Sequence, residues 1–174
     1  SDTIQDKYFA ICGNVVSSKE AIFNLTSLVI KIQQEFHLTP VFLVADEKDL
    51  EFSDALKQSC NELIIIDNAT NIDTVLDIIE KSEFFITGRF HPFIFSLTVG
   101  AKVITFSSNT HKIEGVKMLI NNCVPNINLK DVTTDFLTVS KFYNSYCDSA
   151  NIQSIETLKS LLPSSYNKLL EDER

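Results

Sequence analysis

Five consecutive residues in the middle of the chain, Gly88-Arg89-Phe90-His91-Pro92, combine a group that binds anions with a group that transfers protons. The guanidinium of Arg89 can hold a carboxylate or a phosphate through two parallel hydrogen bonds. His91 adds an imidazole, a group that can give or take a proton beside such an anion. The segment therefore predicts an anion site with an adjacent acid. Its structural alternative is an Arg–carboxylate bridge with a histidine that caps a helix.

A second polar segment, Ser107-Ser108-Asn109-Thr110-His111-Lys112, follows the next apolar run of the chain. If the two apolar runs form neighbouring strands, both polar segments face the same cleft. Ser107 and Asn109 are then candidate substrate-binding residues, because hydroxyl and amide groups can donate to a ligand. The alternative is an ordinary polar surface loop.

Alternating strands and helices are expected to position these residues. Short apolar runs closed by turn residues predict five buried strands, at 8–12, 41–44, 63–66, 84–87 and 102–106. Apolar residues three and four apart predict helices between them, and Pro92 favours a helix start. We therefore expect an α/β fold, a Rossmann-like doubly wound parallel sheet of five to six strands with right-handed crossovers.

Residues 1–174 are expected to form one Rossmann-like domain, since length suggests a single core and no repeat or linker divides the chain. Residues 133–174 are predicted to be C-terminal helices, over 135–146 and 152–170.

Composition narrows the classes of function. Fifteen basic and 23 acidic residues give a net charge of −8, which argues against a nucleic-acid surface. No apolar run is long enough to span a membrane. The single glycine of the first turn, Gly13, excludes the three-glycine dinucleotide fingerprint, and no phosphate-binding lysine loop occurs. The four cysteines form no zinc pattern with the three histidines, so no metal and no cofactor are predicted, and the thiols are expected to be reduced.

The segments 83–95, 100–104 and 112–115 together resemble the polysaccharide pyruvyl transferase family. The similarity covers about residues 72 to 120 and consists of an acidic residue, an apolar strand, an R-[LF]-H motif, a small apolar helix and a downstream lysine. The family is similar to two-domain glycosyltransferases of the GT-B type, in which two Rossmann-like halves face each other. The resemblance implies that this chain is the C-terminal half of such an enzyme.

The resemblance also implies a reaction, the transfer of pyruvate from phosphoenolpyruvate to a sugar as a ketal during synthesis of cell-surface polysaccharide. Donor-binding roles then fall to Arg89 and Lys112, and His91 is the expected catalytic acid that protonates the methylene carbon. The implied partners are phosphoenolpyruvate, a glycan or lipid-linked sugar acceptor, and an N-terminal domain. The implied location is the cytoplasm, at the inner face of the membrane where a lipid-linked substrate would hold the enzyme.

Two other classes of function stay open. The chain could be the nucleotide-sugar half of a GT-B glycosyltransferase, with Asp67 or Glu83 as the carboxylate that binds ribose. It could also be a non-catalytic module that binds an anion or supports assembly. With half of the expected cleft in another domain, we predict that the chain alone does not turn over.

Overall fold

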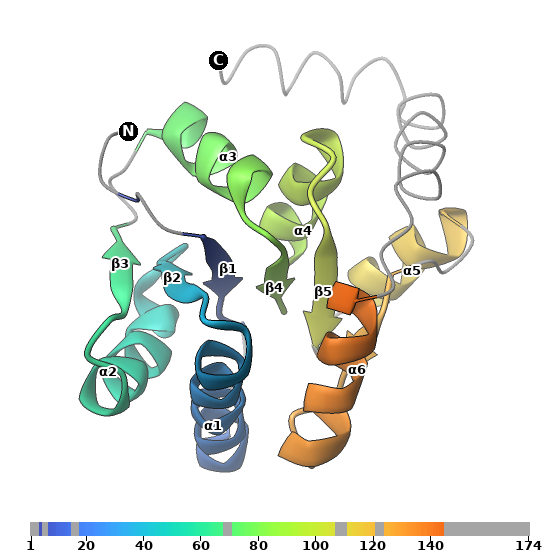
Figure 1. Cartoon of the computed structure of the whole chain (residues 1–174). Coiled ribbons are helices and arrows are strands. Elements are labelled where there is room, and N and C mark those ends of the chain that lie inside the picture. Colours follow the sequence, from blue (N-terminus) through green and yellow to red (C-terminus); the bar gives the residue numbers. More distant parts are fainter. Residues whose placement is uncertain are drawn as a thin grey trace.

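The computed structural model describes residue 4 and residues 7–14, 18–67, 71–106, 111–120 and 124–144. Within them, six parallel strands form one sheet in the order β3-β2-β1-β4-β5-β6 (Figure 1). The fold class predicted from the sequence is confirmed. The strands are β1 (Tyr8–Cys12), β2 (Thr39–Leu43), β3 (Ile64–Ile66), β4 (Phe85–Thr87), β5 (Val103–Phe106) and β6 (Asn126–Ile127).

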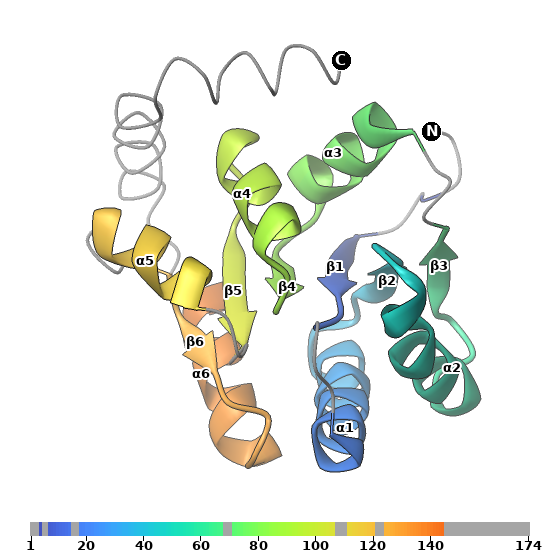
Figure 2. The same ribbon diagram turned by 180° about the vertical axis from the view of Figure 1, so that it is seen from behind.

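Helices cover both faces of the sheet, as Figures 1 and 2 show from opposite sides. Because side chains alternate along a strand, Phe9 and Ile11 of β1 pack toward one layer and Ala10 and Cys12 toward the other. The first layer holds α1 (Lys19–Phe36), α2 (Leu50–Ser59) and α6 (Val132–Asn144). The second holds α3 (Ile72–Lys81), α4 (Phe90–Thr98) and α5 (His111–Leu119).

Helix α1 illustrates how local sequence sets the elements. Its apolar stripe is buried against the sheet, through side chains that include Leu25, Val29 and Ile32. The hydroxyl of Ser18 caps the first turn by accepting a hydrogen bond from the Ala21 amide at 3.1 Å. His37 ends the helix in the left-handed region, with a φ of 54°, and its amide donates to the Gln33 carbonyl at 2.9 Å.

Two element starts near the candidate residues differ from the prediction. Helix α4 begins at Phe90, so Pro92 is its third residue and not its first. A proline is tolerated there because first-turn amides have no partner within the helix. Helix α5 begins at His111, which moves Lys112 from the expected loop into a first helical turn. The helix predicted over 152–170 lies outside the described residues.

Strand order reverses between β1 and β4, which are neighbours although two strands and three helices separate them in sequence. In open parallel sheets a crevice for ligands opens at this reversal, beyond the carboxyl ends of the strands. The two loops that border it are held together, since the Gly88 amide donates to the Gly13 carbonyl at 3.1 Å.

Candidate functional site

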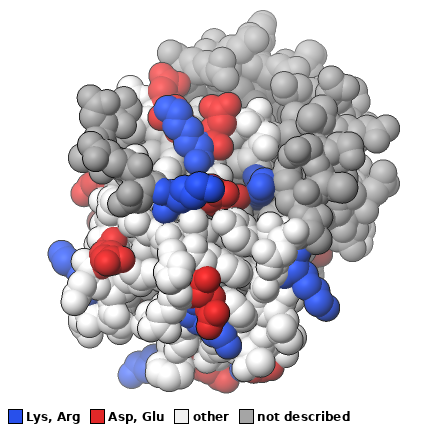
Figure 3. Space-filling model, in the orientation of Figure 1, with Lys and Arg blue, Asp and Glu red and all other residues white. Residues whose placement is uncertain are grey.

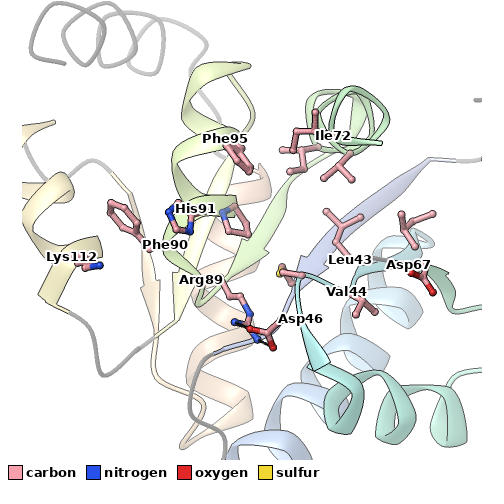
Figure 4. A pocket seen from close by; sticks show the side chains of 16 residues that line it. Leu43, Val44, Asp46, Asp67, Ile72, Arg89, Phe90, His91, Phe95 and Lys112 are labelled. Carbon is pink, nitrogen blue, oxygen red and sulfur yellow. Dashed lines mark hydrogen bonds and ion pairs between the residues drawn. The ribbon is translucent and has the colours of Figure 1, made fainter. Parts of the chain in front are cut away.

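A cavity of about 540 Å³ lies at the carboxyl ends of β1, β2 and β3, beside α3 and α4. Its wall is mainly apolar, and its polar groups are Asp46, Asp67, Arg89, His91 and Lys112. In Figure 4, His91, Phe90 and Lys112 lie on one side of the cavity and Asp67 on the other, with Arg89 and Asp46 between them. The apolar wall is formed by Cys12, Leu43, Val44, Ile66, Ile72, Val75, Ile79 and Phe95.

The guanidinium of Arg89 is buried between two carboxylates from the loop after β2. Its Nη1 and Nη2 donate to the two oxygens of Asp46 at 2.6 and 2.8 Å. Its Nε and Nη2 donate to Oδ1 of Asp49 at 2.9 and 2.7 Å. The Arg–carboxylate bridge that the sequence left open is therefore present, and it ties the loop before α4 to the loop after β2.

The short helix η1 (Glu47–Asp49) holds both carboxylates in place. Asp46 caps it by accepting from the Lys48 amide at 2.7 Å. Asp49 is fully buried, and its second oxygen accepts from the amides of Ala45 and Asp46 at 2.9 and 3.2 Å. Gly13 passes directly against the Asp49 carboxylate, so a Cβ at this position would clash with it. The single glycine of the first turn thus makes room for an ion pair.

The pKa values in this cluster follow from burial and from the ion pairs. Burial alone would raise the pKa of Asp46, but hydrogen bonds from Arg89 and from the Lys48 amide hold it below its usual value. The pKa of Arg89 is raised, because the bonds to Asp49 and Asp46 outweigh desolvation. Burial, followed by the Asp49 charge, raises the pKa of the Cys12 thiol, so Cys12 is a neutral wall residue.

The start of α4 supplies the other polar side of the cavity. His91 is exposed there, one residue into the helix, next to first-turn amides that have no partner in the helix. The Phe90 ring lies between two cationic or ionisable groups, with its centroid 5.5 Å from that of His91 and 5.7 Å from Nζ of Lys112. The arrangement can bind a small anion beside an imidazole that can transfer a proton.

The structure thus brings together three of the five predicted site residues, Arg89, His91 and Lys112, along one cavity. Ser107 and Asn109 lie outside the described residues. Of the two carboxylates considered for ribose, Asp67 lines the cavity. Glu83 precedes β4 at the opposite edge of the sheet, where it pairs with Lys7 at 3.2 Å. Among the described residues, no group of three or more His, Cys, Asp or Glu could hold a metal ion.

Asp46 and Asp49 were not predicted as site residues. A signal for them exists, since an Asp-x-x-Asp segment directly after a strand must lie at the same edge of a parallel sheet as Arg89. Their pairing with Arg89 joins residues 40 and 43 positions apart in sequence, and spacing alone does not reveal it.

On the described surface seen in Figure 3, acidic and basic side chains are interspersed, and no wide basic face is visible there. No helix in the described ranges is long and apolar enough to cross a membrane.

Several solved structures share this fold. UDP-GlcNAc 2-epimerase of Methanocaldococcus jannaschii superposes with a TM-score of 0.64 at 15% identity, over 89% of this chain and 46% of that enzyme. A trehalose-phosphate synthase of Burkholderia vietnamiensis superposes with a TM-score of 0.60 at 8% identity, over 97% of this chain and 43% of the synthase. The C-terminal CMP-Kdo-binding domain of WaaA from Acinetobacter baumannii superposes with a TM-score of 0.55 at 10% identity, over 90% of this chain and 89% of that domain. The chain spans about half the length of the epimerase and the synthase, and nearly all of the WaaA domain.

Fold and site therefore define a Rossmann-like domain of the type found in GT-B glycosyltransferases. No curated protein matches the sequence as a relative. Residues 6–110, more than half of the chain, match the family described as polysaccharide pyruvyl transferase, and the chain belongs to that family.

Proposed function

We propose that this domain binds phosphoenolpyruvate and transfers its pyruvyl group to a sugar as a ketal. The observation that carries the proposal is the meeting of His91, Lys112 and the start of α4 at one cavity, within a chain of the pyruvyl transferase family. Phosphoenolpyruvate carries a phosphate and a carboxylate, and a cation beside free helix amides suits such a ligand.

Each group has a distinct part in the proposed reaction. Lys112 and the first-turn amides of α4 hold the anionic groups of the donor. Arg89 lines the same cavity, and because Asp46 and Asp49 share its guanidinium, it positions the two loops around the donor. His91 gives a proton to the methylene carbon, which makes the neighbouring carbon electrophilic toward a sugar hydroxyl. Two C–O bonds to the sugar form and the C–O bond to phosphate breaks. Of the two hydroxyl protons released, one restores His91 and the other leaves with inorganic phosphate.

Transfer needs a second domain in this proposal. The chain spans about half of two GT-B-like neighbours, and a ligand bound at one Rossmann-like half is exposed until another half covers it. We therefore expect the 174 residues alone to bind the donor without turnover. The acceptor is a glycan or lipid-linked sugar, and the proposed site of action is the cytoplasmic face of the membrane.

Isothermal titration with phosphoenolpyruvate tests the proposal in the intact protein. Lys112→Ala removes one charge-assisted contact and should weaken binding about tenfold. The matched control is Lys57→Ala, which removes an exposed lysine of α2 that does not line the cavity. Absence of heat with wild-type protein, or equal affinity in Lys112→Ala and wild type, would contradict the proposal.

The apolar wall of the cavity favours a second candidate function, the binding of a nucleotide sugar. Aliphatic and aromatic side chains line a volume much larger than a pyruvyl donor needs, and they could pack against a base or a sugar ring. The epimerase and WaaA structures are described with UDP-GlcNAc and as a CMP-Kdo-binding domain, respectively. Titration with UDP or UDP-GlcNAc that gives heat, with none from phosphoenolpyruvate, would favour this function.

A further inference from the structure

The cavity has two chemically different polar sides. The side formed by Lys112 and the start of α4 attracts anions. The side formed by the Arg89 cluster does not, because two carboxylates against one guanidinium leave one net negative charge. A ligand that fills the cavity should therefore place an anionic group on the first side and hydrogen-bond donors on the second.

The Arg89 cluster cannot easily open to take an anion. Both edges of the guanidinium are occupied, by Asp49 on one edge and by both oxygens of Asp46 on the other. An anion that displaced Asp46 would also break the cap that this residue gives to η1. Asp46 is thus held as a fixed carboxylate at the cavity rather than as a mobile stand-in for a ligand.

Asp46 still has an open hydrogen-bonding position. Its Oδ1 accepts two bonds, from Arg89 and from the Lys48 amide, whereas its Oδ2 accepts one, from Arg89. A carboxylate oxygen can accept two. The side chain is 47% exposed and lines the cavity, so a ligand can reach the second lone pair of Oδ2. The neighbouring Asp49 is completely buried and offers nothing to a ligand.

We infer that Asp46 binds a sugar hydroxyl of the ligand: the hydroxyl donates a hydrogen bond to the open position of Oδ2. This assignment rests on the proposed function for the donor side of the cavity. A volume of about 540 Å³ leaves room for a sugar beside a donor of about ten non-hydrogen atoms. Asp46 is then a specificity-determining residue, since a hydroxyl at the matching carbon is required and an ether or deoxy carbon leaves the carboxylate unpaired.

Two ligands could supply this hydroxyl, the acceptor sugar or the ribose of a nucleotide. The acceptor must carry free hydroxyls because the ketal forms on them. The ribose of a nucleotide, the ligand of the second candidate function, also carries free hydroxyls. Either hydroxyl would donate the same hydrogen bond to Asp46. Probes that carry or lack one hydroxyl distinguish the two ligands.

The test compares hydroxyl and deoxy probes on the intact protein, measured by ligand-observed NMR titration. One set is the methyl glycosides of glucose, galactose and mannose with their singly deoxygenated counterparts, and the other is UDP with 2′-deoxy-UDP. Each is titrated into wild type, Asp46→Asn and the control Asp54→Asn, which changes an exposed carboxylate of α2 outside the cavity. One deoxy probe loses a hydrogen bond to a charged group. Its affinity for wild type and for the control should therefore be about ten- to a hundredfold lower than that of the hydroxyl probe.

In Asp46→Asn the same deoxygenation should change affinity by less than about tenfold, because the amide oxygen accepts only a neutral hydrogen bond. A second readout needs no variant: the hydroxyl probe, and not its deoxy partner, should shift the wild-type amide resonance of Lys48, which donates to Asp46. Deoxygenation effects that are absent from wild type, or equal in wild type and Asp46→Asn, would overturn the assignment. Failure of wild type to bind phosphoenolpyruvate, with hydroxyl coupling to Asp46 intact, would instead refute the proposed function.

Discussion

The two carboxylates that bind Arg89 should contribute very differently to stability, because one is buried and the other is half exposed. Asp49 is completely shielded from water and receives two bonds from Arg89 and two from backbone amides. Asp46 makes three bonds with 47% of its side chain exposed. We predict that Asp49→Ala destabilises the fold more than Asp46→Ala, although both remove one partner of the same guanidinium.

The expected magnitudes follow from burial. Breaking a buried ion pair by removing one partner costs about 3 to 5 kcal/mol, and Asp49→Ala should fall at the lower end because Asp46 still neutralises Arg89. Asp46→Ala should cost about 1 to 2 kcal/mol, the sum of a partly solvated ion pair and a helix cap. With a urea m-value of about 2 kcal/mol/M, the two unfolding midpoints should differ by roughly 1 M.

Urea unfolding followed by circular dichroism measures both variants, and a double-mutant cycle separates the ion pair from other effects. In an Arg89→Met background the buried Asp49 has lost its counter-charge, so Asp49→Ala should cost little or even stabilise the protein. The coupling energy between the two positions should then be about 2 to 3 kcal/mol. A coupling below about 0.5 kcal/mol, or equal costs for Asp49→Ala and Asp46→Ala, would refute the reasoning from burial.

Three further changes test the surroundings of the site. Gly13→Ala should destabilise the fold by about 2 kcal/mol or more in urea unfolding, because the new methyl group displaces Asp49, whereas an unchanged midpoint would mean that the loop yields freely. Lys117 is buried, and desolvation lowers its pKa, so its charge gains little from being in the fold. The free energy of unfolding of Lys117→Met, which keeps the volume of the stem, should therefore stay within about 1 kcal/mol of wild type. Lys117→Ala should lose about 2 to 4 kcal/mol from the cavity left by its stem, and equal midpoints for these two variants would contradict this. The pKa of Asp46 is lowered on folding, so its contribution is present above about pH 4 and is lost as pH falls through the lower folded value. The difference in unfolding free energy between wild type and Asp46→Asn should therefore be constant from about pH 5 to 7 and shrink below about pH 4, and a difference that grows on acidification would show the wrong sign.

Most of the fold could be predicted from the sequence because the strands and helices are encoded locally. The apolar run of β1 and the three-and-four spacing in α1 depend only on neighbouring residues. Strand β6 was missed because it has only two residues, one of them the polar Asn126, and so shows no apolar run. It is a strand because it pairs with Thr105 and Phe106 of β5. The start of α4 was placed too late, because the preference of proline for the first helical position does not exclude the third.

Site residues could be predicted where they stand together in one loop at the end of a strand. They could not be predicted where they come from loops that are distant in sequence. Arg89 and His91 stand in one short motif, and β4 and β5 do pair, which is the condition for the two polar segments to lie side by side. The carboxylates that hold Arg89 come from the loop after β2, on the other side of β1, so their partner depends on a strand order that periodicity does not specify. Glu83 is close to Arg89 in sequence but lies at the amino end of β4, because it precedes that strand whereas Arg89 follows it.

The ion-pair cluster changes how an acidic chain can bind an anionic donor. With Arg89 already shared by two carboxylates, the positive potential in the cavity comes from Lys112 and from the start of α4. Lys112 is exposed and contacts the Phe90 ring, and no carboxylate among the described residues pairs with it, so its charge is available to a ligand and is also screened by salt. Binding of a small anion should therefore weaken with ionic strength through Lys112, while Arg89 sets the geometry of the loops and keeps Asp46 ionised toward the sugar side.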